Sequence, residues 1–173
     1  MNIEIREIGI AHAEKLSALA IAIYKQYFLY LWNDGGEWYL NRTYHINTIT
    51  AELADPNNVH YIAYKNEQPL GYLKIRKDGI LEGYENSDCL EVDKIYILQE
   101  AARAGIGKKL MQVAFDLAST LKKDTVFLKS MDSSTNSIAF YKKLGFKNGG
   151  SLTLPFEQMK AEYRGMVILK KEM

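Results

Sequence analysis

Apolar residues recur along the chain with two periodicities, one typical of helices and one typical of strands. Apolar positions recur three and four residues apart in four segments, as on the buried face of an amphipathic helix. These segments are residues 12–28, 37–53, 108–121 and 134–144. Short β-rich runs lie around them, at residues 3–5, 59–64, 70–75, 90–98, 125–128 and 166–169. The order of these elements predicts a mixed sheet with helices on its faces.

Turn and capping residues indicate where several elements end. Residues 55–58 (Asp-Pro-Asn-Asn) stop the second helix, and residues 65–69 separate two strands as in a β-hairpin. The serines at 133–134 offer an N-cap for the last helix, which Gly145 ends in the usual C-terminal glycine position. The glycine pair at 149–150 is interpreted as a break between elements.

Composition narrows the class of protein. The chain has 173 residues, of which 47% are hydrophobic and 25% charged, and this suits one globular domain with a sizeable core. It holds neither the run of about 18 to 20 apolar residues of a membrane span nor the pattern of a secretory signal. Its single cysteine, Cys89, cannot form an internal disulfide. We therefore expect a cytoplasmic protein without a membrane partner.

The net charge of +1 argues against a general nucleic-acid binder, but it conceals an uneven distribution. Residues 1–93 hold 8 basic and 14 acidic side chains, whereas residues 94–150 hold 10 basic and 4 acidic ones. Residues 82–93 contain five acids and no base. Either this is chance on a solvated surface, or the two parts of the chain meet ligands of opposite charge.

The segment with the clearest chemical content is residues 95–110, in which a strand leads through a Gly-x-Gly turn into a helix. The first free N–H groups of such a helix, together with its dipole, favour a bound phosphate. A P-loop of nucleotide triphosphatases would need glycine at 102 and serine or threonine at 109, where the chain has Ala102 and Lys109. A dinucleotide-binding fingerprint would need glycine at Leu110. Neither motif fits.

This segment resembles a known family when it is taken together with a second one. The run Ile95-Tyr96-Ile97 through Arg103-x-Gly105-Ile106-Gly107-Lys108-x-Leu110, followed about 30 residues later by Ala139-Phe140-Tyr141-Lys142-Lys143-Leu144-Gly145-Phe146, is similar to the GNAT superfamily of acyl-CoA-dependent N-acetyltransferases. The resemblance implies a single α/β (α+β) domain over residues 1–173. Its fold would be a mixed, mostly antiparallel sheet of about seven strands with about four helices on its faces.

The resemblance also implies acetyl-CoA as co-substrate. The turn from Arg103 to Lys108 would hold the CoA pyrophosphate, and the strand around Ile95 and Ile97 would hold the pantetheine arm. The implied cofactor-binding residues are Ile95, Ile97, Arg103, Ala104, Gly105, Ile106, Gly107, Lys108, Ser134 and Asn136. Two positions depart from the family pattern, since Ala102 replaces a glutamine or arginine and Ser134 replaces an asparagine. These departures affect side-chain contacts to CoA and leave the backbone turn intact.

Acetyl transfer needs a group that takes a proton from the amine and one that gives a proton to the departing thiolate. Tyr141 stands at the position of the family's tyrosine acid, and the alternative is a core tyrosine. Glu91 stands where one branch of the family has its base, and Asp93 is expected on the same face. The alternative for both is a merely acidic strand edge. No covalent enzyme intermediate is implied, so Cys89 is expected to be structural.

Metal chemistry is not expected, because His12, His45 and His60 lack the spacing of metal ligands.

The acceptor side is expected near residues 24–44, which hold eight of the twenty aromatic residues. Tyr30, Trp32, Glu37 and Trp38 are the candidate acceptor-binding residues, because aromatic faces and carboxylates suit a cationic amine. Runs at residues 52–57, 71–74 and 90–96 look most like the bacterial polyamine N-acetyltransferase branch, so a polyamine or diamine is the leading acceptor.

Several alternatives remain open. Protein or peptide amines, amino acids and aminoglycosides are other acceptors, and a non-catalytic acyl-CoA sensor or a nucleotide-phosphate binder is possible from other classes. A homodimer is also left open.

Overall fold

The computed structural model describes residues 2–173, and its centre is one seven-stranded sheet with the order β1-β2-β3-β4-β5-β7-β6. All neighbours pair antiparallel except β4 and β5, which run parallel. The strands are β1 (Glu4–Ile8), β2 (Asn58–Lys65), β3 (Gln68–Arg76), β4 (Cys89–Ile97), β5 (Thr125–Met131), β6 (Lys147–Thr153) and β7 (Gly165–Glu172). The predicted mixed, mostly antiparallel sheet is confirmed.

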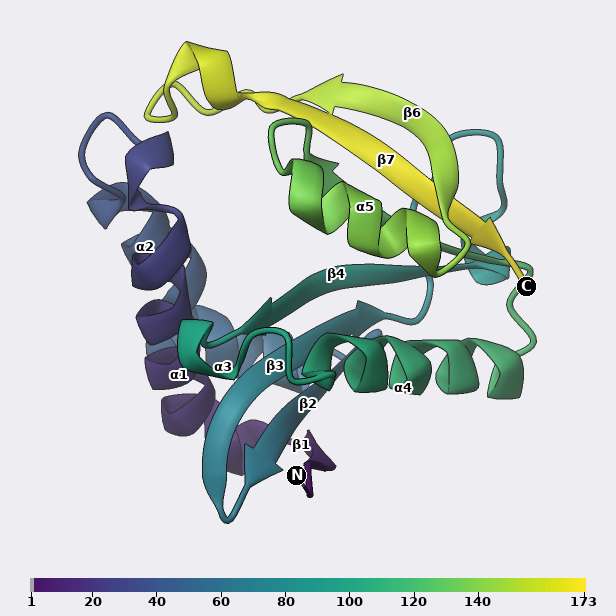
Figure 1. Ribbon diagram of the computed structural model, residues 1–173, viewed down its shortest axis with the longest axis horizontal. Helices are drawn as coiled ribbons and strands as arrows, with labels where there is room; N and C mark the ends of the chain where they lie inside the picture. Colours follow the sequence, from purple (N-terminus) through teal and green to yellow (C-terminus); the bar gives the residue numbers. More distant parts are fainter. Residues whose placement is uncertain (1) are drawn as a thin grey trace.

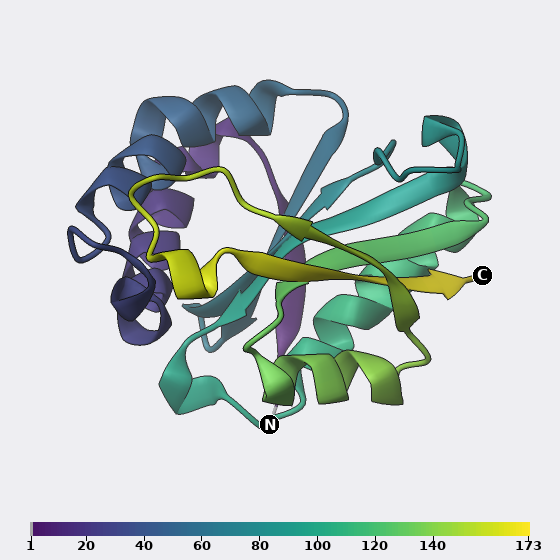
Figure 2. The same cartoon turned by 90° about the horizontal axis from the view of Figure 1, so that it is seen from above.

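Helices cover both faces of this sheet (Figures 1 and 2). They are α1 (Ala13–Tyr27), α2 (Glu37–Tyr44), α3 (Ile46–Ala54), α4 (Ile106–Thr120) and α5 (Thr135–Lys143). Short 3₁₀ turns occupy Ile10–His12, Leu29–Leu31, Asn86–Asp88, Gln99–Ala101 and Ala161–Tyr163. The side chains of α1 to α3 bury one face of the sheet, and those of α4 and α5 bury the other. Among residues 2–173, no helix is long and apolar enough to span a bilayer.

The predicted second helix, residues 37–53, is wrong as one element, because it divides at His45. The backbone of His45 is extended, with φ −57° and ψ 142°, and its Nδ1 accepts a hydrogen bond from the Asn47 N–H at 3.2 Å. The side chain therefore caps α3 and turns the chain between two short helices. Apolar periodicity continues across the division, so hydrophobicity alone does not reveal it.

The glycine pair at 149–150 was predicted to be a break between elements. In the structure it lies inside β6. The register with β7 skips Gly149, since Asn148 pairs with Leu169 and Gly150 with Ile168. Gly150 has φ +137°, a backbone conformation that residues other than glycine rarely adopt. The two glycines therefore form a β-bulge within an edge strand.

The loop between β6 and β7 is joined to the segment before α2. Trp32 and Met159 form an isolated antiparallel bridge, with hydrogen bonds from Asn33 N–H to the Gln158 carbonyl (2.9 Å) and from Lys160 N–H to the Leu31 carbonyl (2.8 Å). Figure 2 shows this loop reaching from the sheet to the helices on the α1–α2 side. The contact joins the β6–β7 loop to the segment before α2 on one side of the sheet.

Candidate active site

The two parallel strands at the centre of the sheet separate part-way along their length. Paired residues run from Cys89–Thr125 to Val92–Leu128, yet β4 continues to Ile97 and β5 to Met131. In Figure 1, β4 diverges from the β6–β7 pair beyond this point. Within the described part of the chain, the backbone of residues 93–97 therefore has no partner on the β5 side, and an extended ligand can occupy this edge.

A β-bulge in β4 at Asp93 decides which side chains face this opening. Lys74 pairs with Lys94 and Ile75 with Val92, which leaves Asp93 as the additional residue. Val92 before the bulge and Ile95 and Ile97 after it all pack on the α4 side. Strict alternation would have placed Ile95 and Ile97 on the face of Glu91. The bulge separates these apolar residues from the carboxylates.

The turn before α4 presents an uninterrupted row of backbone N–H groups. Arg103 and Gly105 have positive φ angles of 65° and 80°, which fold the chain tightly into the helix. Within residues 2–173, the N–H groups from Arg103 to Lys108 have no hydrogen-bond acceptor, and the first bonded one belongs to Lys109. Free N–H groups at a helix N-terminus form an anion-binding site.

The predicted cofactor residues of this turn differ in what they expose. The side chains of Arg103, Ala104 and Lys108 are exposed, whereas Ile106 is buried in the core and offers only its backbone. A Cβ added to Gly107 would lie 3.3 Å from Phe140 Cζ and 3.4 Å from Ile97 Cδ1. The glycine turn, β4 and α5 therefore meet at one point.

The start of α5 lies at the other side of the opening. Ser134 is its N-cap residue and partly buried, but its hydroxyl accepts no capping hydrogen bond. Asn136 is exposed in the first turn. Tyr141 packs against Phe140 and Phe146, with ring centroids 5.3 and 6.0 Å away. Burial raises the pKa of Tyr141 well above its usual value, so the phenol keeps its proton at neutral pH.

Glu91 is a buried carboxylate held between two cations. Its Oε2 lies 3.5 Å from Arg76 Nη1, and its Oε1 lies 3.5 Å from Lys129 Nζ. Burial, followed by the negative charge of Asp93, raises the pKa of Glu91, while Lys129 and Arg76 act in the opposite direction. A carboxylate with a raised pKa is a better proton acceptor than an ordinary surface glutamate.

Asp93 lies on the same side as Glu91 but in a different electrostatic state. Its carboxylate is 2.9 Å from Lys74 Nζ, 3.7 Å from Lys94 Nζ and 3.8 Å from Arg76 Nη2. Burial would raise its pKa, but the charges of Lys94, Lys74 and Arg76 together lower it to about 2. So acidic a group is a poor base, and this disfavours Asp93 as the residue that takes a proton from an amine.

Residues 18–146 match the acetyltransferase (GNAT) family. The chain belongs to that family. An uncharacterized N-acetyltransferase from the pepI 3′ region of Lactobacillus delbrueckii subsp. lactis is 24% identical over 107 residues, which are 62% of each chain. The match thus spans less than two thirds of that relative.

Solved structures show the same GNAT fold. The PaiA N-acetyltransferase of Thermoplasma acidophilum, in complex with coenzyme A, has a TM-score of 0.77 at 18% identity over 100% of both chains. YncA of Salmonella typhimurium, a putative acetyltransferase with its cofactor acetyl-CoA, has a TM-score of 0.73 at 17% identity. That likeness covers 99% of this chain and 94% of the other. At these identities the likeness establishes the fold.

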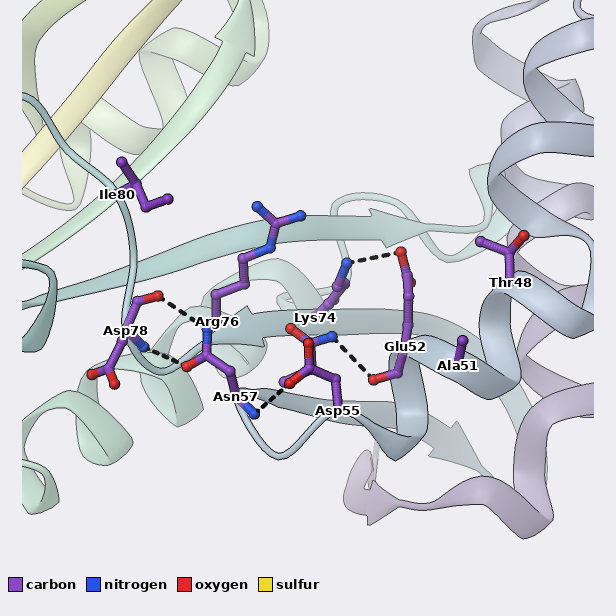
Figure 3. Close-up of a pocket in the computed structure, with 10 residues that line it drawn as sticks. Thr48, Ala51, Glu52, Asp55, Asn57, Lys74, Arg76, Asp78 and Ile80 are labelled. Carbon is purple, nitrogen blue, oxygen red and sulfur yellow. Dashed lines mark hydrogen bonds and ion pairs between the residues drawn. The ribbon is translucent and has the colours of Figure 1, made fainter.

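The GNAT chain has a buried lysine that sequence reasoning did not assign to the site. Lys74 is 2% exposed, and its Nζ lies 3.0 Å from Glu52 Oε1 (Figure 3). The same Nζ lies 2.9 Å from Asp93 Oδ2. It thereby ties α3 to the bulge in β4. A lysine between the apolar residues Leu73 and Ile75 of a central strand is the signal that could have revealed it, because lysine is rarely buried unless paired.

Replacement of Lys74 by methionine is expected to lower the free energy of unfolding by about 3 kcal/mol, because removing one partner leaves buried carboxylates uncompensated. The loss falls at the low end of the usual range, since Asp93 retains Lys94 and Arg76. Urea denaturation measures it. Lys65→Met, at an exposed position of the neighbouring strand β2, is the matched control and should change stability by no more than about 0.5 kcal/mol. Equal stability of the two variants would contradict a structural role for Lys74.

Histidine and cysteine take no visible part in the site. His60 is buried opposite Lys74, and burial together with the Lys74 charge lowers its pKa to about 4, so it is neutral. Cys89 is also buried, and burial raises the pKa of its thiol. Among residues 2–173, no group of three histidine, cysteine or acidic side chains is placed to hold a metal ion.

Two of the four predicted acceptor-binding residues, Trp32 and Trp38, pack against each other, with ring centroids 5.8 Å apart. Trp32 is a core residue, 2% exposed, which stacks on Tyr39 and donates a hydrogen bond from Nε1 to the Tyr24 hydroxyl at 2.8 Å. This burial argues against the predicted acceptor-binding role of Trp32, because a tryptophan so enclosed has no face left for a ligand. Tyr30 is exposed and packs edge-on against Tyr163.

The other two acceptor candidates lie on α2. Glu37 lines a pocket of about 570 Å³ between α1 and α2. Trp38 packs against Phe156 of the β6–β7 loop and under the guanidinium of Arg42. Tyr39, which was not predicted, lies near the carboxylates: burial raises its pKa, and so does the charge of Asp93. The aromatic run is thus mainly a packing layer.

Proposed function

We propose that this GNAT protein transfers the acetyl group of acetyl-CoA to a primary amine. The observation that carries the proposal is the row of free backbone N–H groups from Arg103 to Lys108 beside the unpaired edge of β4. A pyrophosphate fits the first and an extended pantetheine arm fits the second. The departures at Ala102 and Ser134 do not weaken this argument, since both sets of donors and acceptors are backbone groups.

The thioester of bound acetyl-CoA supplies an activated carbonyl carbon. Glu91 accepts the proton that the amine loses as its nitrogen bonds to that carbon, and its raised pKa suits this role. The hydroxyl of Tyr141 donates a proton to the sulfur as the carbon–sulfur bond breaks, since the phenol is protonated at neutral pH. Direct transfer between the two substrates needs no nucleophile from the protein, and this agrees with the burial of Cys89.

The resemblance of the sequence to the polyamine branch suggests a polyamine or diamine as acceptor. Against it, the carboxylates that face the site have cationic partners: Glu52 and Asp93 share Lys74, and Glu91 has Arg76 and Lys129. A polycation would have to displace these partners. The proposal therefore specifies a primary amine and not a polycation.

A screen of primary amines with acetyl-CoA, read as release of free CoA thiol, tests the function. The panel should include spermidine, putrescine, L-amino acids, their amides, a peptide N-terminus and an aminoglycoside. We expect saturable release with at least one class of amine. Tight acetyl-CoA binding without release for any amine would support the sensor alternative, and displacement of CoA by ATP would support a nucleotide-phosphate binder.

A further inference from the structure

A pocket of about 450 Å³ lies beside the carboxylates, between the end of α3 and the loop that follows β3 (Figure 3). Its walls come from segments that are distant in sequence. The lining residues are Thr48, Ala51, Glu52, Asp55, Asn57, Asn58, Lys74, Arg76, Asp78 and Ile80. This volume suits a small metabolite better than a protein surface.

Arg76 is the residue that connects this pocket to the proposed base. Its guanidinium lines the pocket and lies 3.5 Å from Glu91 Oε2 and 3.8 Å from Asp93 Oδ1. Both contacts are too long for well-formed hydrogen bonds. The side chain is 43% exposed, so its N–H groups remain accessible to a ligand. A guanidinium presents paired donors that match a carboxylate.

Arg76 is the most accessible cation that lines the pocket. Four cationic side chains, Lys74, Arg76, Lys94 and Lys129, surround three carboxylates, Glu52, Glu91 and Asp93. With Asp55, Asp78 and the Lys123 that pairs with Asp78, the positive and negative charges balance. Lys74 is 2% exposed and held against Asp93, and Lys94 and Lys129 do not line the pocket. Arg76 is therefore the cation through which the pocket can bind a negative group.

The two remaining acids of the pocket already have partners. Asp55 Oδ1 accepts a hydrogen bond from the Asn57 N–H at 2.9 Å, and Asp78 is paired with the ammonium group of the buried Lys123. Ile80, which is 75% exposed, adds an apolar wall, and Ala51 adds another. The pocket thus combines one accessible cation with apolar surface, a combination that suits a small molecule with both a carboxylate and a hydrocarbon part.

We propose that Arg76 binds a carboxylate of the acceptor, and that the acceptor is an α-amino acid. In such a molecule one carbon separates the amine from the carboxylate. Arg76 and Glu91 are in direct contact, so they are spaced to hold the carboxylate and to take the proton from the neighbouring amine. This inference rests on the proposed acetyl transfer and adds the class of acceptor to it.

Matched acceptors test the inference. Each common L-amino acid is compared with its own amide and with the amine left by removal of its carboxyl group, and spermidine represents the polycations. We expect kcat/KM to be about 10- to 100-fold higher for at least one acid than for its amide, as for a hydrogen-bonded charge pair. Amidation lowers the pKa of the adjacent amine and makes it more reactive, so a preference for the acid would not arise from amine reactivity.

Variants of Arg76 locate the source of that preference. In Arg76→Gln the ratio of kcat/KM between acid and amide should fall toward one, and Arg76→Lys should give an intermediate ratio. Any effect of Arg76 on Glu91 acts on acid and amide alike, so it cancels in the ratio. Arg6→Gln is the matched control and should leave the ratio unchanged, because Arg6 is also held by two carboxylates but lies at the β1 edge of the sheet.

The outcomes separate the inference from the function on which it rests. Equal or better turnover of amides or spermidine, or an unchanged ratio in Arg76→Gln, overturns the amino-acid assignment and leaves acetyl transfer intact. Failure of every amine to release CoA overturns acetyl transfer and the assignment together.

Discussion

Replacement of Glu91 by glutamine is expected to lower kcat by about 10²- to 10⁴-fold, the usual contribution of a general base. Glutamine keeps the volume of the side chain but cannot accept a proton from the amine. The buried position also loses its pairing with Lys129 and Arg76, so stability should be measured alongside activity. Glu82→Gln, in the exposed loop before β4, is the control and should retain full kcat.

The pH dependence distinguishes a base from a merely structural carboxylate. Glu91 is active when deprotonated, so kcat should rise with pH through a pKa that burial and Asp93 hold above the usual glutamate range. In Glu91→Gln this acidic limb should disappear, leaving activity flat across the same interval. An unaltered pH–rate profile in a folded Glu91→Gln protein would mean that water or another group takes the proton.

Replacement of Tyr141 by phenylalanine is the second change with a large expected effect, a decrease in kcat of about 10²- to 10³-fold. Only the hydroxyl is removed, so the thiolate would leave without a proton donor. The ring remains in place against Phe140 and Phe146, and we therefore expect little change in melting temperature or in the KM for acetyl-CoA. Steady-state kinetics at saturating substrates measure the effect.

Tyr61→Phe is the matched control for this prediction. Tyr61 lies on β2, packs on the same core cluster, and burial likewise raises the pKa of its phenol. It should keep normal turnover because β2 lies two strands away from β4, where the strand opening begins. If Tyr141→Phe and Tyr61→Phe turn over equally fast, Tyr141 is a packing residue and the proton must come from elsewhere.

Elements with a strong local signal could be predicted from the sequence. The β2–β3 hairpin was predicted because its connection holds turn-forming residues, and Asn66 and Glu67 do adopt positive φ angles. The helix after the Gly-x-Gly turn begins at Ile106, two residues before the predicted start. By contrast, His45 divides a helix, and Gly149 and Gly150 form a bulge rather than a break. In those places backbone geometry outweighed the local pattern.

The sequence by itself determined the family, the mixed sheet with helices on its faces, and the glycine turn from Arg103 to Lys108. Each depends on residues that are close together in the chain, so periodicity and motif spacing carry the information. Only the tertiary structure decided which residues share a face of β4, because the bulge at Asp93 reverses the alternation there. It also decided the charges of the site. Lys74, Arg76 and Lys129 come from β3 and β5, and their contacts with Glu91 and Asp93 place cations against an acidic stretch of sequence.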